Sequence, residues 1–100
     1  MDPIKKRFRK LNKQERKLSM IYPKIQEATK ELEILKIKSQ SAYNKYVLTR
    51  YGSFQEMHSA KIAAENKADE LWVLHDKELR IRHKIDGLYE RLVESSNLTA

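Results

Sequence analysis

Apolar residues recur every seven positions along two long segments, and this repeat constrains the fold more than any other feature of the chain. We label the repeating positions a and d, the pair that forms the contact surface of a coiled coil. In the first segment the a positions are Ile4, Leu11, Leu18, Ile25, Leu32, Ser39 and Tyr46, and the d positions are Arg7, Gln14, Ile21, Ala28, Leu35, Ala42 and Thr49. In the second segment the a positions are Met57, Ala64, Leu71, Glu78, Ile85 and Leu92, and the d positions are Ala60, Lys67, Leu74, Ile81, Leu88 and Ser95. The pattern predicts two long helices that pack through one seam.

Stop and start signals for a helix stand together between the two segments. Gly52 can adopt the left-handed conformation that ends a helix. Ser53 can cap the next helix, and Glu56 completes a capping box with it. We therefore predict a first helix over about residues 3–51, a turn over about 51–53 and a second helix over about 54–96. Because the turn is short, the two helices should run antiparallel.

Composition also favours an all-α fold. The chain has 100 residues, only two glycines and no cysteine. Two glycines are too few for the tight turns of a sandwich, barrel or doubly wound sheet. The absence of cysteine excludes disulfides and thiolate metal sites. We therefore predict that residues 1–100 form a single domain, a long antiparallel two-helix hairpin.

The position of the turn sets the expected pairing between the helices. A hairpin that reverses at residue 52 places Leu35 opposite Leu71 and brings Leu32 and Leu74 into the same region. We expect this layer to be the best packed, because branched apolar side chains meet there. Pro23 should kink the first helix, and the alternative is a short first helix separated from a second. Gly87 either weakens the second helix or lets a bulky neighbour approach it.

Positive charge is concentrated at the beginning of the chain. The first 24 residues hold nine Lys or Arg and two acidic residues, so they carry the whole formal net charge of +7. We interpret residues 1–17 as a basic arm for an acidic partner or phosphates, and expect the part before about Phe8 to project as a mobile extension. The residues predicted to bind are Lys5, Lys6, Arg7, Phe8, Arg9, Lys10 and Lys13. The alternative is a charged helix end that only keeps the protein soluble.

A second set of apolar residues falls outside the a and d positions. These residues lie toward the turn half of the hairpin: Ile34, Ile37, Leu48, Tyr51, Ile62, Trp72, Val73 and Leu79. We interpret them as a face that binds a partner protein, or that joins two hairpins into a four-helix bundle. The third reading is that they are isolated exposed residues, which need no explanation.

The sequence contains no pattern typical of catalysis or cofactor binding. The histidines are His58, His75 and His83, and no two of them have the i,i+4 spacing of a helical zinc site. Phosphate-binding glycine loops and nucleophile motifs are also missing. We therefore expect no enzyme activity, no metal and no cofactor.

These features together favour a non-enzymatic coiled-coil interaction module: an adaptor, a chaperone or a stalk component of a larger assembly. In architecture the predicted hairpin resembles the two-helix stalk proteins of bacterial export machines and rotary ATPases. We expect a protein partner or self-association. The alternative is a nucleic-acid-binding protein that places its basic helix on phosphates, in architecture similar to the helical arm of seryl-tRNA synthetases. Membrane binding is not expected, and we predict a cytoplasmic location, or a nuclear one in a eukaryote.

Overall fold

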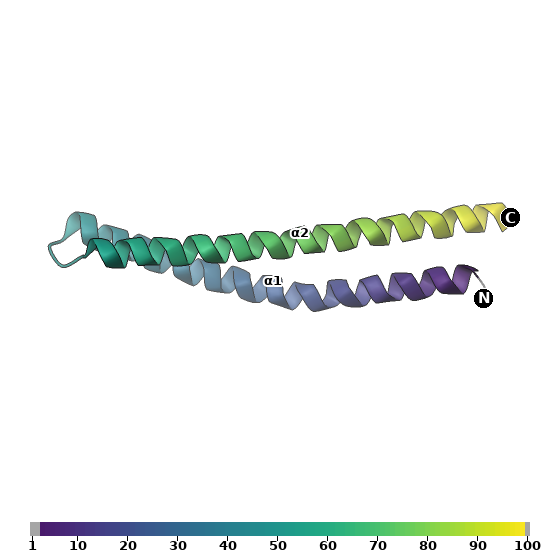
Figure 1. The fold of residues 1–100 in the computed structure, drawn as a ribbon, viewed down its shortest axis with the longest axis horizontal. Helices are drawn as coiled ribbons and strands as arrows, with labels where there is room; N and C mark the ends of the chain where they lie inside the picture. The colour runs from purple at the N-terminus through teal and green to yellow at the C-terminus, as the bar shows by residue number, and fades with distance from the viewer. Residues whose placement is uncertain (1–2, 100) are drawn as a thin grey trace. The chain divides into compact units, whose positions relative to one another are not determined.

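The protein is an all-α helical hairpin (Figure 1). A computed structural model describes the backbone of residues 3–99 and the side chains of residues 3–94. Helix α1 spans Pro3–Leu48 and helix α2 spans Phe54–Thr99, each with 46 residues, and no strand occurs within the described range. The two helices pack against each other in opposite directions. The predicted fold class is therefore confirmed.

The predicted seam is where the side chains are buried. Every a and d position from Arg7 to Ala42 on α1, and from Met57 to Leu92 on α2, is buried or half-buried. The buried apolar residues all occupy these positions: Leu11, Ile21, Ile25, Ala28, Leu32, Ile85 and Leu88. A pair of helices is stabilised mainly by the burial of one narrow apolar stripe on each helix, here formed by the a and d residues.

The hairpin divides into two compact units. The first unit joins Met1–Pro23 to His75–Ala100, and the second is Lys24–Leu74. In the first unit Leu11, Ile85 and Leu88 form a cluster, against which the a and d residues Leu18, Ile81 and Leu92 pack. In the second unit the buried residues Ile25, Ala28 and Leu32 belong to α1.

The pairing between the helices differs from the predicted register by about one heptad. In the second unit Lys67 forms an ion pair with Glu31, although the predicted register places Lys67 near Lys38. Leu35 and Leu71 are only partly buried, so the best-packed layer is not the one predicted; Leu11, in the first unit, is 4% exposed. The reason is the position of the turn: α1 ends at Leu48, so the chain reverses earlier than predicted, and the Phe54 ring packs edge-on against Tyr46 with ring centroids 6.0 Å apart.

The structure of the turn confirms the predicted cap of α2 and corrects two other predictions, the end of α1 and the conformation of Gly52. The Ser53 hydroxyl accepts a hydrogen bond from the Glu56 backbone N–H at 3.1 Å, so Ser53 caps α2 as predicted. Helix α1 ends at Leu48 rather than at residue 51, and the Thr49 hydroxyl donates to the Lys45 carbonyl at 2.6 Å. Gly52 does not adopt a left-handed conformation. Glycine is instead required there because a Cβ would overlap the backbone of Lys45 and Tyr46.

Pro23 lies inside α1, and the helix continues through it. This excludes the alternative in which a short first helix is separated from a second. The boundary between the two units falls directly after Pro23. Gly87 also lies inside a continuous helix, and a Cβ at this position would meet no atom within 4 Å. Close approach of a bulky neighbour therefore does not explain this glycine.

Candidate anion-binding groove

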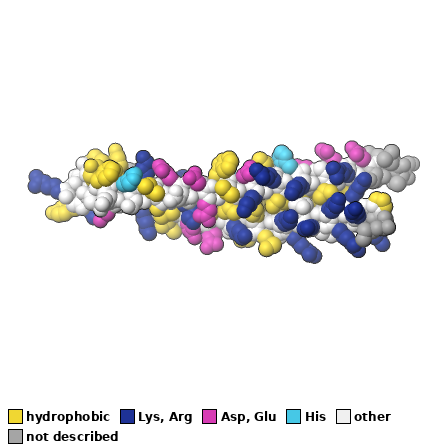
Figure 2. All heavy atoms as spheres, viewed as in Figure 1, with side chains coloured by type: hydrophobic (Ala, Val, Ile, Leu, Met, Phe, Trp, Pro, Cys, Tyr) yellow, Lys and Arg dark blue, Asp and Glu magenta, His cyan; other side chains and the backbone are white. Residues whose placement is uncertain are grey.

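Lysine and arginine occupy the positions that flank the seam along one edge of the first unit. We call the position before each a residue g, and the position before each d residue c. In an antiparallel pair the g positions of the two helices face each other across the same edge. On α1 these positions hold Lys10 and Lys17, and on α2 they hold Lys77, Lys84 and Arg91. The c positions of α1 add Lys6 and Lys13 to this edge. Lys and Arg side chains accordingly gather over this part of the surface in Figure 2.

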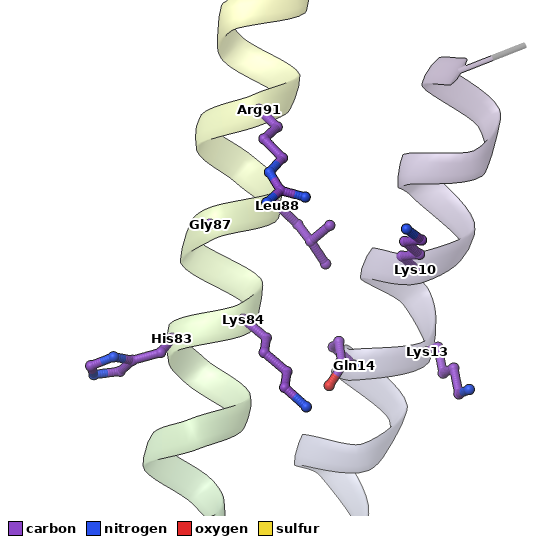
Figure 3. A pocket seen from close by; sticks show the side chains of 8 residues that line it. All are labelled: Lys10, Lys13, Gln14, His83, Lys84, Gly87, Leu88 and Arg91. Carbon is purple, nitrogen blue, oxygen red and sulfur yellow. The ribbon is translucent and has the colours of Figure 1, made fainter.

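A groove of about 540 Å³ runs between the helices at this edge. Figure 3 shows its lining, which comes from both helices: Lys10, Lys13, Gln14, His83, Lys84, Gly87, Leu88 and Arg91. None of these eight residues is acidic. The described ion pairs include none formed by Lys10, Lys13 or Lys84. These three lysines therefore bring positive charge to the groove that none of the described ion pairs neutralises.

Two features of the groove are unfavourable for a helical pair that serves only as a scaffold. Gly87 lies in a helix interior with open space beside it, and glycine there costs about 0.5–1 kcal/mol relative to alanine. The Oε1 atom of Gln14 is buried and has no hydrogen-bond partner within the described part of the chain. A buried acceptor without a partner is destabilising by about 1–3 kcal/mol. Both residues line the groove, so its local sequence departs from what packing alone favours.

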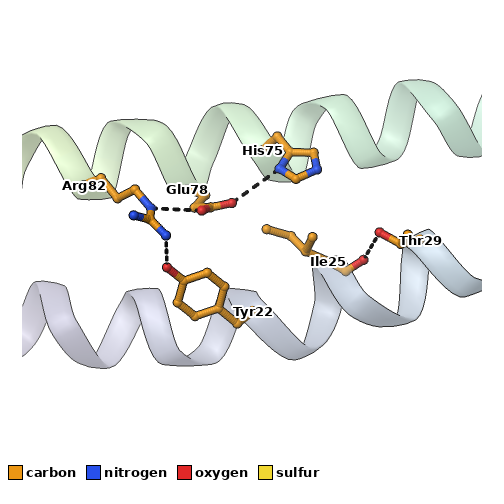
Figure 4. Close-up of polar contacts among 6 residues, drawn as sticks. All are labelled: Tyr22, Ile25, Thr29, His75, Glu78 and Arg82. Carbon is orange, nitrogen blue, oxygen red and sulfur yellow. Dashed lines mark hydrogen bonds and ion pairs between the residues drawn. The ribbon is translucent and has the colours of Figure 1, made fainter.

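The opposite edge of the first unit is neutralised by side-chain contacts. Arg82 donates to the Glu78 carboxylate at 2.9 Å and also to the Tyr22 hydroxyl, and Glu78 lies 3.3 Å from the His75 ring (Figure 4). The Tyr89 hydroxyl donates to Glu15 at 3.1 Å. This hydrogen bond and the Glu15 charge raise the pKa of Tyr89 above its ordinary value. The Arg82 charge on this edge is thus balanced by Glu78 on the same helix, and the hydrogen bonds of Tyr22 and Tyr89 join the two helices.

The second unit also balances its charges at the g positions. Glu31 on α1 and Glu70 on α2 are like charges at facing g positions, and Lys67 lies between them. The Lys67 ammonium is 2.6 Å from Glu31 and 2.8 Å from Glu70. The hydrogen bonds to these carboxylates raise the pKa of Lys67 well above its ordinary value. The two units therefore differ: in the second unit Lys67 contacts both acidic residues, whereas no described acidic side chain forms an ion pair with the groove lysines.

The structure brings only part of the predicted basic arm into the groove. Lys10 and Lys13 line it, whereas Lys5, Lys6, Phe8 and Arg9 are exposed on α1 outside its lining. Arg7 is partly buried, and its guanidinium donates to the Arg91 carbonyl at 2.9 Å. Pairing of the helices thus reaches Arg7, so the expected extension before about Phe8 is shorter than predicted. The physical reason is that the long Arg7 side chain spans the seam to a backbone acceptor on α2.

The groove residues on α2 were not predicted from the sequence. His83, Lys84 and Arg91 lie in a region with equal numbers of basic and acidic residues, so the count of charges along the chain conceals them. The signal that identifies Lys84 and Arg91 is their seven-residue spacing at the g position, because that spacing places both on one edge of the helix.

The predicted partner face is exposed throughout. Its eight residues are Ile34, Ile37, Leu48, Tyr51, Ile62, Trp72, Val73 and Leu79, with exposed fractions from 41% for Ile62 to 86% for Tyr51. All except Leu79 belong to the second unit. Association through this face stays a prediction, which the mass of the protein in solution tests.

No cluster of metal-ligating side chains occurs among the residues that the structure describes. Over the same residues, neither helix has a stretch apolar enough to cross a membrane. Comparison with known proteins gives no relative: no family model, no curated protein and no solved structure matches the chain.

Proposed function

We propose that this protein is a non-enzymatic coiled-coil interaction module, acting as an adaptor, chaperone or stalk component, and that it holds an acidic partner along the basic edge of its first unit. The observation that carries this proposal is the groove lined by Lys10, Lys13, Lys84 and Arg91 without an acidic lining residue. The predicted role of the basic N-terminal segment is thereby extended to a surface built by both helices.

Electrostatics supports binding rather than structural stabilisation at this edge. Flanking positions of coiled coils usually carry opposite charges on the two helices, because the resulting ion pairs favour the correct pairing. Like charges at such positions are destabilising by a few tenths of a kcal/mol for each pair. An anion bound in the groove would remove this repulsion, so the arrangement favours the bound state over the free one.

The chemistry of the lining also favours binding over catalysis. Its cations are exposed lysines and an arginine, and His83 is the one lining residue of a type that commonly acts as a general acid or base. Acid–base catalysis usually requires a converging set of groups in a pocket that excludes water. We therefore propose that the lining attracts and positions a charged partner and carries out no reaction.

A charge-matched pair of variants tests this proposal. The groove variant changes Lys10, Lys13 and Lys84 to Gln. The control variant changes three exposed lysines of the second unit, Lys30, Lys36 and Lys61, to Gln, so both variants lose the same charge. Binding to labelled polyanions, measured by fluorescence anisotropy, should weaken strongly in the groove variant and little in the control. Equal losses in both variants would show that only net charge matters.

A further inference from the structure

We propose that the anion held in the groove is the phosphate backbone of double-stranded nucleic acid, bound without reading the base sequence. This inference rests on the proposed function and adds the chemical class of the partner. It concerns a surface that includes Lys84 and Arg91 on α2, and not only the basic N-terminal segment.

The composition of the basic edge favours a nucleic acid over an acidic protein. Interfaces between proteins have an apolar core with aromatic anchors and are depleted in lysine. The groove differs in its residue types, because three of its four Lys or Arg residues are lysines and Leu88 is the one aliphatic residue among the described residues of its lining. Protein–DNA interfaces are more polar and much more positively charged than interfaces between proteins.

The type of cation points in the same direction. A carboxylate is best matched by the planar fork of arginine, which donates two parallel hydrogen bonds. Lysine acts as a point charge and donates to phosphate oxygens that approach from many directions. Lys10, Lys13 and Lys84 therefore suit a row of phosphates better than a set of carboxylates that need a defined orientation.

The spacing of the cations matches a linear anion with closely repeated charges. Lys6, Lys10, Lys13 and Lys17 follow one another at intervals of four, three and four residues, so they share one side of α1. At a rise of ~1.5 Å per residue this row is about 16 Å long. One strand of a DNA duplex presents a phosphate every ~3.4 Å of its axis, so several phosphates face the row at once.

The lining also indicates a duplex rather than a single strand. Proteins that bind single strands generally stack the bases on Phe, Tyr or Trp side chains. The eight lining residues include none of these three types. Phe8 is exposed on α1 but lies outside the groove lining. Contacts made only to phosphates hold a duplex in place without sequence preference.

The salt dependence of binding gives a quantitative expectation. Each phosphate neutralised in a duplex contributes about 0.9 to the slope of log affinity against log salt. Three lysine contacts therefore account for about 40-fold of the affinity lost between 50 and 200 mM salt. The magnitude of this slope should be smaller by about 2.7 in the groove variant than in the wild type. In the control variant of the second unit it should differ from the wild type by no more than about 0.9, the value for one phosphate contact.

The experiment measures binding of the full chain to a short labelled DNA duplex, to its single strand and to poly-L-glutamate, at 50 and 200 mM salt. We expect the duplex to bind most tightly and to depend on the three groove lysines. A further variant with Lys10, Lys13 and Lys84 changed to Arg should retain the salt slope, and circular dichroism of every variant verifies that the helices are intact.

The possible outcomes separate this inference from the proposed function. Tighter binding to poly-L-glutamate, still lost in the groove variant, would overturn the nucleic-acid inference and leave the acidic-partner function standing. Tighter binding to the single strand would overturn the preference for a duplex. If the groove and control variants bind every polyanion equally, the inference and the proposed function are both wrong.

Discussion

Replacing Gln14 by leucine should stabilise the hairpin. Gln14 occupies a d position between Leu11 and Leu18, and its buried Oε1 atom has no hydrogen-bond partner among the described residues. An unpaired buried acceptor costs about 1–3 kcal/mol, and leucine removes it while adding an apolar side chain to the seam. We expect the free energy of unfolding to rise by about 1–3 kcal/mol, which raises the melting temperature by about 4–8 °C for each kcal/mol.

Urea denaturation followed by far-UV circular dichroism measures this change. The matched control is Gln26→Leu, because Gln26 is an exposed glutamine on the same helix, outside the a and d positions. That substitution should alter the free energy of unfolding by no more than about 0.5 kcal/mol. A Gln14→Leu variant that is no more stable than the Gln26→Leu control would refute the argument, because the Gln14 amide would then be satisfied in solution.

Three further predictions follow from the turn, the groove and the exposed apolar face. Gly52→Ala should destabilise the protein by more than about 1 kcal/mol, because the added Cβ overlaps the backbone of the preceding helix, whereas Gly87→Ala should stabilise it by about 0.5–1 kcal/mol. Thermal denaturation should therefore show a lower melting temperature for the first variant and a higher one for the second, and melting temperatures that change equally would contradict the prediction. Lys84→Glu should raise the free energy of unfolding by a few tenths of a kcal/mol at low salt and weaken polyanion binding; a variant that gains stability and binds as tightly as the wild type would show that the groove is not the site. Replacement of Ile34, Ile37 and Trp72 by polar residues should lower the solution mass measured by light scattering, or abolish binding of a protein partner, without loss of helicity. A wild type that is already monomeric and binds nothing through this face would contradict this prediction.

The seven-residue repeat was sufficient to predict the fold class and the residues of the seam. It could not determine the register, because sliding one helix by a whole heptad leaves every a and d residue in contact with the other helix. The register depends instead on the turn, where α1 ends at Leu48 and Phe54 packs against Tyr46. The seven-residue repeat predicts neither the end of α1 nor the packing of these two rings.

The candidate groove was only partly predictable for a related reason. Lys10 and Lys13 belong to a run of cations that is visible in the sequence. Lys84 and Arg91 contribute only after the helices are paired, since they are far from that run along the chain and are interspersed with acidic residues. The acidic residues between them lie at other heptad positions, which a count of charges does not distinguish. Spatial convergence of cations from two helices is therefore information that the structure adds.

The ion pairs of Lys67 affect which helix α2 can pair with. In a parallel dimer of two α2 helices, the Lys67 side chains of both copies would meet at facing d positions and repel each other. In the hairpin the same lysine contacts Glu31 on α1 and Glu70 on its own helix. Lys67 therefore penalises pairing of α2 with another copy of itself and favours α1 as its neighbour. A polar residue at one seam position often selects the pairing partner in this way, at some expense of apolar burial.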